Sequence, residues 1–290
     1  MADLNRKIPE TIDSPLLIGL PEGTPQIEYT NMEDIKCLVD RRAQLCCLDT
    51  SKSPFIIVIN IPHTFLQDFD NVYPDKGPRI SVNLRDRVLI LETMVSKVHE
   101  IAAPGLEGYL RERIRDMKFN YITTRSGAGR ATSDTFTKEP DGSFTLQDRD
   151  WPILVIEAGV SEAEDKLNID ARRWLESPKS ETEVVITIKI NRHSPEITFK
   201  KWEKSSATPQ RVTRCSHQPA ISNEIIHAKY QNDVTEITGD MVIPLAKIAG
   251  RGPQNSNEND ITVTKAAFEE ICKEVSGGSA RAGGKWVFPS

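Results

Sequence analysis

The spacing of hydrophobic residues changes several times along this 290-residue chain, and each spacing predicts a different element. Between residues 85 and 102, apolar positions recur every three or four residues, which predicts an amphipathic helix that ends before Pro104-Gly105. Residues 106–117 keep this spacing and predict a second helix. Residues 55–61 instead form a short apolar run rich in β-branched side chains, which predicts a strand.

Three strand patterns follow the second helix, over residues 118–124, 135–146 and 151–159. A helix is predicted next, because Ser161 and Glu164 have the spacing of a capping box. Its apolar stripe comprises Leu167, Ala171, Trp174 and Leu175. A second, charged stripe of the same helix comprises Lys166, Asp170 and Arg173.

A further strand, over residues 183–191, follows this helix. Because a helical crossover joins parallel strands, the strands at 151–159 and 183–191 are expected to be parallel. Residues 196–204 and 223–230 predict appended antiparallel strands, and residues 260–274 predict a closing helix. The sequence therefore predicts an α/β fold with a mixed central sheet, flanking helices and antiparallel extensions.

The predicted organisation divides the chain into four segments. Residues 1–30 are rich in Pro, Thr, Glu and Gly without a sustained period, which predicts a poorly ordered lead-in. An N-terminal extension is expected over residues 31–80, and it begins with a short helix after Asn31. The main domain is expected over residues 81–276, followed by a tail at 277–290.

Composition narrows the class of protein. The chain is 38% hydrophobic and 27% charged, as in ordinary globular proteins. Its apolar runs are shorter than the roughly 18 residues of a membrane span, and the N-terminus lacks the apolar region of a secretory signal. The five cysteines are odd in number and have no metal-type spacing, which predicts reduced thiols. We therefore expect an intracellular protein with no membrane association.

Charge is unevenly distributed along the chain. The net charge of −5 does not indicate a nucleic-acid-binding protein. However, residues 111–130 and residues 192–214 each contain six Lys or Arg against two acidic residues. These stretches are consistent with a basic face on an acidic protein, or with ordinary solvated surface.

Two acidic residues stand at strand ends in the middle of the chain. Asp141 precedes one predicted strand segment, and Glu157 lies near the end of the next apolar run. Carboxylates from neighbouring strands can together hold Mg²⁺, which needs only one or two protein carboxylates besides water and phosphate. Such a site suffices for metal-assisted cleavage of a phosphodiester.

Residues 138–144 (KEPDGSF), 148–162 (DRDWPILVIEAGVSE) and 170–175 (DARRWL) resemble the PD-(D/E)XK nuclease superfamily. In particular, they resemble the nuclease-like domain proteins common in fungal genomes, over about residues 80–275. The resemblance implies a restriction-endonuclease-like fold and hydrolysis of nucleic acid, with DNA as the expected substrate. It also implies that Asp141 and Glu157 bind the metal, Mg²⁺ or Mn²⁺.

The same resemblance implies a catalytic lysine two residues after the second acid, where this chain has Gly159. A lysine stabilises the extra negative charge of the transition state, so a replacement would have to reach the site from elsewhere. Lys166 and Lys189 are the candidates. The superfamily often adds an acid from the helix before the first strand, which points to Glu92 as a metal ligand, with Glu100 as the alternative.

Two other interpretations remain open. The missing lysine favours a catalytically inactive nuclease-like module that binds nucleic acid or a protein partner. Independently of any family, Pro140-Asp141-Gly142 has the composition of an ordinary turn, and Glu157 could simply end a buried strand. A hydrolase that uses His with Cys or Ser is disfavoured, because the five histidines lie outside recognisable nucleophile motifs.

Overall fold

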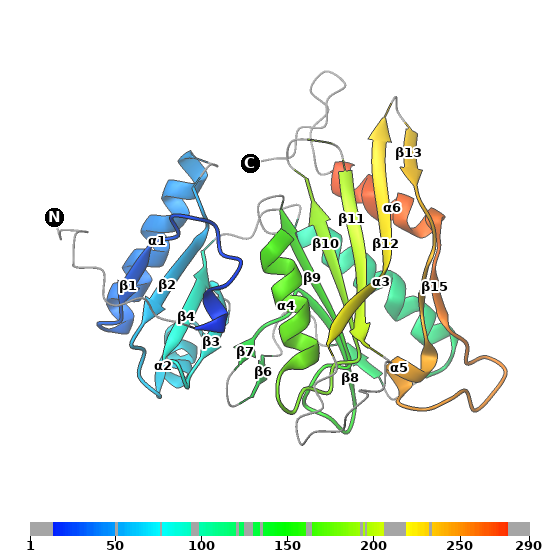
Figure 1. The fold of residues 1–290 in the computed structure, drawn as a ribbon, viewed down its shortest axis with the longest axis horizontal. Helices are drawn as coiled ribbons and strands as arrows, with labels where there is room; N and C mark the ends of the chain where they lie inside the picture. The colour runs from blue at the N-terminus through cyan, green and yellow to red at the C-terminus, as the bar shows by residue number, and fades with distance from the viewer. Residues whose placement is uncertain are drawn as a thin grey trace. The chain divides into compact units, whose positions relative to one another are not determined.

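The chain folds into two compact units, seen in the computed structural model in Figure 1. The first comprises residues 1–94 with 134–137, and the second comprises residues 95–133 with 138–290. The structure describes residues 14–49, 52–75, 77–93, 99–119, 122–124, 130–133, 136–160, 164–191, 194, 196–205, 219–231 and 234–277. Within these residues, no helix is long and apolar enough to cross a membrane.

The first unit is built on four strands that pair in the order β1-β2-β4-β3. These strands are β1 (Gln26–Glu28), β2 (Phe55–Ile59), β3 (Arg79–Asn83) and β4 (Val88–Glu92). Two short strands, β6 (Ala131–Thr132) and β7 (Thr137–Lys138), come later in the chain. Strand β1 is parallel to β2, whereas β2, β4 and β3 are antiparallel. The unit also contains a short 3-10 helix η1 (Pro15–Leu17) and helices α1 (Met32–Leu48) and α2 (Phe65–Val72).

Both faces of this sheet are buried. Residues of α1 and α2, including Ile35 and Phe65, pack on one face, and Leu16 of η1 packs on the other. A strand that is covered on both faces reads as a continuous apolar run rather than an alternating one. Strands β2 and β4 fit this description, since almost every residue in them is buried.

This double coverage explains one wrong prediction. Residues 85–102 do not form one helix, because residues 88–92 are strand β4 and the next helix begins only at His99. The boundary predicted between residues 80 and 81 is also wrong, since it falls inside β3 and the first unit continues to Met94.

Within the predicted lead-in, residues 14–30 contain η1 and β1, whereas residues 1–13 lie outside the described part. The predicted helix after Asn31 is confirmed, and the Asn31 side chain caps it by accepting from Asp34 N at 2.9 Å.

The second unit contains a mixed sheet with the order β13-β12-β11-β10-β9-β8-β5. Its strands are β5 (Ile122–Thr124), β8 (Gly142–Leu146), β9 (Leu154–Val160), β10 (Val184–Ile190), β11 (Glu196–Lys204), β12 (Ala220–Gln231) and β13 (Val234–Ile237). Strands β9 and β10 are parallel, as predicted, and the other neighbours are antiparallel. Helix α4 (Glu164–Glu176) makes the crossover between them, although residues 161–163 of the predicted capping box lie outside the described part.

Helices cover both faces of this sheet (Figure 1). Helices α3 (His99–Asp116) and α6 (Lys265–Gly277) share the main core with the strands, and α4 packs against β9 and β10 from the opposite face. A two-stranded sheet, β14 (Met241–Ile243) and β15 (Ile261–Val263), and helix α5 (Leu245–Ala249) complete the unit. The predicted closing helix therefore begins late, because residues 261–263 form β15. The predicted mixed sheet, flanking helices and antiparallel extensions are confirmed.

Candidate active site

The two predicted acids lie on neighbouring strands. Strands β8 and β9 are antiparallel with Gly142 opposite Ile156, so Asp141 comes just before β8, next to Glu157 in the continued register. The backbone N–H of Asp141 donates to Ile156 O at 3.1 Å, and Asp141 Oδ2 accepts from the N–H of Ala158 at 2.6 Å. Asp141 is thus bonded to the residues on either side of Glu157. Both carboxylates are buried, with 6% and 4% of the residue surface exposed.

The Glu157 carboxylate has two strong partners. Its Oε1 accepts from Trp174 Nε1 at 2.6 Å, and its Oε2 pairs with Lys138 Nζ at 2.9 Å. Trp174 belongs to the apolar stripe of α4, all four members of which are buried as predicted. The burial of Glu157 is therefore compensated by an indole donor from α4 and an ammonium group from β7.

The charged stripe of α4 forms an ion cluster around Asp170. Lys166 Nζ lies 2.5 Å from Asp170 Oδ1, and Lys138 Nζ lies 2.6 Å from Asp170 Oδ2. Arg173 Nη1 lies 3.3 Å from Asp170 Oδ1. Because Lys138 contacts both Asp170 and Glu157, it links this cluster to the acid pair.

Electrostatic shifts follow from this arrangement. Burial would lower the pKa of Lys138, but Asp170 and Glu157 outweigh burial and raise it. Burial, with repulsion from Lys138 and Arg173, lowers the pKa of Lys166 to about 8, although Asp170 opposes the change. Burial would raise the pKa of Asp170, but its three cationic neighbours hold it below the ordinary aspartate range. Lys138 is therefore the firmly charged cation of the site.

Gly159 occupies the position where the superfamily pattern expects lysine. A Cβ at Gly159 would lie 3.0 Å from Leu167 Cδ1 and 3.1 Å from Leu167 Cγ. Leu167 is itself buried in the contact between α4 and the sheet. A side chain at this position would therefore require the buried Leu167 side chain to shift.

The structure places the two predicted lysine substitutes differently. Lys166 joins the Asp170 cluster, one carboxylate away from Lys138. Lys189 is the register partner of Gly159 on β10, and it lines an open pocket on this face of the sheet. Lys138 was not predicted as a substitute, although its ammonium group contacts Glu157 directly.

The acid expected from the preceding helix also differs. Glu92 ends β4 in the first unit, so the reason for selecting it, a position on the helix before β5, was wrong. The side chain of Glu100 lies outside the described residues. Helix α3 instead contributes Glu107, which is only 2% exposed.

Glu107 lies against the start of β8. Its Oε2 is 3.1 Å from the point that a Cβ on Gly142 would occupy, and its Oε1 accepts from Arg111 at 2.8 Å. Burial raises the pKa of Glu107, and the bond from Arg111 opposes this change. Glycine at position 142 thus leaves room for the Glu107 carboxylate against the start of β8. The available sequence signal was an i,i+4 Glu-Arg pair next to an apolar stripe.

The donor chemistry is compatible with a hard divalent cation. Asp141 and Glu157 supply oxygen ligands of the kind that Mg²⁺ and Mn²⁺ prefer. Among the described residues, no group of three or more His, Cys, Asp or Glu is arranged to hold a metal. Two carboxylates are enough when water and phosphate complete the coordination. Glu157 Oε2 is paired with Lys138, but a carboxylate oxygen has a second lone pair, so this oxygen can still offer one to a metal.

Comparisons with known proteins add little to this geometry. No family model matches the sequence, and no curated protein is significantly similar to it. Among solved structures, the chain is similar to a protein from Anabaena variabilis described as a "putative nuclease belonging to DUF820", with a TM-score of 0.39 and 14% identity. The alignment covers 71% of this chain and 98% of that chain. A likeness of this strength supports no functional conclusion, so the chemistry of the site follows from its own residues.

Proposed function

We propose that the protein is a nuclease-like hydrolase of the PD-(D/E)XK type that cleaves phosphodiester bonds in nucleic acid, with DNA as the expected substrate. The observation that carries this proposal is the arrangement of Asp141, Glu157 and Lys138. Two buried carboxylates occupy neighbouring strands, and an ammonium group lies 2.9 Å from one of them. The combination supplies ligands for a cation and a positive charge for the transition state.

In this proposal, Asp141 and Glu157 hold Mg²⁺ or Mn²⁺. When bound, the metal lowers the pKa of a coordinated water and stabilises negative charge on phosphate oxygens. Lys138 takes the part of the lysine that Gly159 lacks, because it reaches Glu157 from β7. Lys166 and Arg173 are positioning residues, since they hold Asp170, which in turn holds Lys138.

The test is nicking of supercoiled plasmid DNA with Mg²⁺ or Mn²⁺. We expect cleavage by the wild type and none by Asp141→Asn or Glu157→Gln, which keep side-chain shape but remove charge. Asp116→Asn and Glu269→Gln are matched controls, because these acids lie on exposed parts of α3 and α6. Circular dichroism checks that each variant is folded. Unchanged cleavage in either site variant would eliminate this site.

A second candidate is a nuclease-like module that binds nucleic acid or a protein without cleaving. It is favoured by the engagement of both Glu157 oxygens within the protein, by Trp174 and Lys138. It is also favoured by the packing of Leu167 over Gly159. DNA binding by a wild type that does not cleave with either metal would establish this alternative over the first.

A further inference from the structure

An open pocket lies on the sheet face that carries Glu157. Its volume is about 240 Å³, and its polar lining comprises Lys189, Asn191, Glu196, Thr198, Lys200 and His227. These residues belong to β10, β11 and β12, except Asn191, which directly follows β10. The proposed chemistry at Asp141 and Glu157 makes no use of this pocket.

Strand register places the pocket beside the acid pair. Glu157 pairs with Thr187 on β10, and Thr187 pairs with Lys200 on β11, so these three side chains form one row on one face. In the next row, Gly159 pairs with Lys189. With strands about 4.8 Å apart and a rise of about 3.3 Å per residue, the Cα of Glu157 lies roughly 8 Å from that of Lys189 and roughly 10 Å from that of Lys200.

The second row continues across the sheet and completes the pocket. Lys189 pairs with Thr198, and Thr198 pairs with His227 on β12. Thr198 Oγ1 lies 3.3 Å from His227 Nδ1, and Glu196 Oε1 lies 3.4 Å from the same nitrogen. Lysine, hydroxyl and imidazole groups therefore converge from three neighbouring strands.

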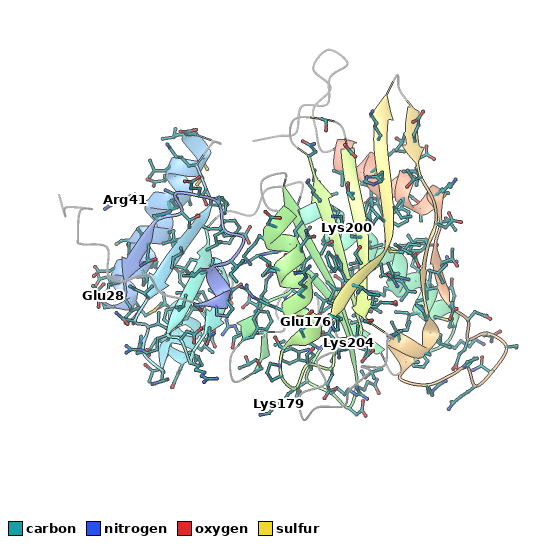
Figure 2. All side chains as sticks on the ribbon, viewed as in Figure 1. Glu28, Arg41, Glu176, Lys179, Lys200 and Lys204 are labelled. Carbon is teal, nitrogen blue, oxygen red and sulfur yellow. The ribbon has the colours of Figure 1, made fainter. Side chains whose placement is uncertain are left out.

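The charge of the pocket is opposite to that of the chain. Among the described residues that line it, two lysines accompany a single acid, Glu196, whereas the chain carries a net charge of −5. Lys189 and Lys200 are partly exposed, and Lys200 can be located on β11 in Figure 2. Lysines combined with hydroxyl and amide donors are the usual ligands of backbone phosphates in nucleic-acid complexes.

We propose that this pocket, defined by Lys189, Thr198, Lys200 and His227, binds a backbone phosphate of the nucleic-acid strand whose neighbouring bond lies at Asp141 and Glu157. The placement of that bond rests on the proposed function. The Cα separations of roughly 8 to 10 Å place the pocket close enough to the acid pair for one nucleic-acid strand to contact both. The pocket would thus fix the register of the strand relative to the acid pair.

The experiment measures binding of a fluorescein-labelled single-stranded DNA oligonucleotide by anisotropy, with the full chain and EDTA, so that cleavage cannot contribute. Lys189→Gln/Lys200→Gln should weaken binding about tenfold and reduce the slope of log K against log salt by about 1.4, which is two contacts at about 0.7 each. Lys265→Gln/Lys273→Gln on α6 removes the same charge outside the pocket, and it should change affinity less than about twofold.

A variant that removes a negative charge from the pocket provides a second test. Glu196→Gln removes the acid from the pocket, so it should tighten binding about threefold, whereas Glu269→Gln on α6 should have little effect. Equal effects of the pocket variants and the α6 variants would overturn the proposal, because net charge alone would then explain them. Binding of inorganic phosphate that is lost in Lys189→Gln/Lys200→Gln, without pocket-dependent oligonucleotide binding, would assign the site to a free phosphate compound and also overturn the proposal.

The two proposals fail separately. Pocket-dependent binding by a wild type that does not cleave would support the pocket and refute the proposed hydrolysis. Cleavage that requires Asp141, with oligonucleotide binding unaffected by Lys189→Gln/Lys200→Gln, would support the hydrolysis and refute the pocket.

Discussion

Replacing Lys138 by methionine should lower the free energy of unfolding of the second unit by about 3 kcal/mol. Removing one partner of a buried ion pair typically costs about 3 to 5 kcal/mol, because the other charge is left buried. Asp170 would keep Lys166 and Arg173, so the loss falls mainly on Glu157. The Glu157 Oε1 would keep its bond from Trp174 while Oε2 loses its cation, which places the expected cost near the lower end of that range.

Urea unfolding followed by tryptophan fluorescence measures this cost. All four tryptophans belong to residues 138–290, so their fluorescence reports the second unit. A double-mutant cycle of Lys138→Met with Glu157→Gln should give a coupling energy of about 1 to 3 kcal/mol. The matched cycle of Arg113→Gln with Asp116→Asn, an exposed pair 3.3 Å apart, should give less than about 1 kcal/mol. A Lys138→Met cost below about 1 kcal/mol, with coupling no larger than in the exposed pair, would refute the assigned role of Lys138.

Three further predictions concern stability. The pKa of Asp170 is lowered from its ordinary 3.8, so its ionised carboxylate stabilises the folded state above pH 3.8 and this stabilisation is lost as the pH falls below 3.8. The stability of Asp170→Asn, measured by acid unfolding, should therefore depend less on pH than that of the wild type. The pKa of Lys166 is about 8 in the folded protein, against an ordinary value of 10.5, so the unfolded chain binds more protons than the folded chain between pH 8 and pH 10.5. The urea midpoint of the wild type should therefore rise with pH over this range, and that of Lys166→Met should not. Gly159→Ala should cost about 1 to 3 kcal/mol in urea unfolding because of its contact with Leu167, whereas Gly108→Ala, with open space at its Cβ, should be neutral or stabilising; equal effects would contradict the packing argument.

The central part of the fold was predictable because its signals are local. The run at 151–159 is apolar and is followed by a helix with separate apolar and charged stripes, so β9, α4 and the parallel strand β10 could be inferred in order. The charged stripe was also predictable, since Lys166 and Arg173 reach Asp170 at i,i+4 and i,i+3 spacing within one helix.

The first unit was not predictable from the same kind of signal. In β4, residues 88–91 are buried by layers on both faces, so polar alternation is lost and the remaining spacing resembles that of a helix. A short apolar run of this kind cannot be assigned by periodicity alone. This error placed Glu92 on a helix, and the buried Glu107 of α3 was not among the predicted acids.

The candidate site was only half accessible to sequence reasoning. Asp141 and Glu157 could be proposed because each stands at the end of its own strand pattern. Lys138 could not be selected in the same way, since its contact with Asp170 joins residues 32 positions apart and Pro140 interrupts strand alternation beside it. Contacts between distant segments have no local spacing to mark them.

Packing and electrostatics together explain why the positive charge at this site comes from an unexpected segment. Leu167 fills the space over Gly159, so a side chain at that position would crowd the contact between α4 and β9. Glu157 is nevertheless buried and needs a compensating charge, which Lys138 supplies from β7. Asp170 then holds Lys138 in place and is itself stabilised by Lys166 and Arg173. The glycine at position 159 is therefore a consequence of close helix packing, and its presence alone does not imply that the site lacks a lysine.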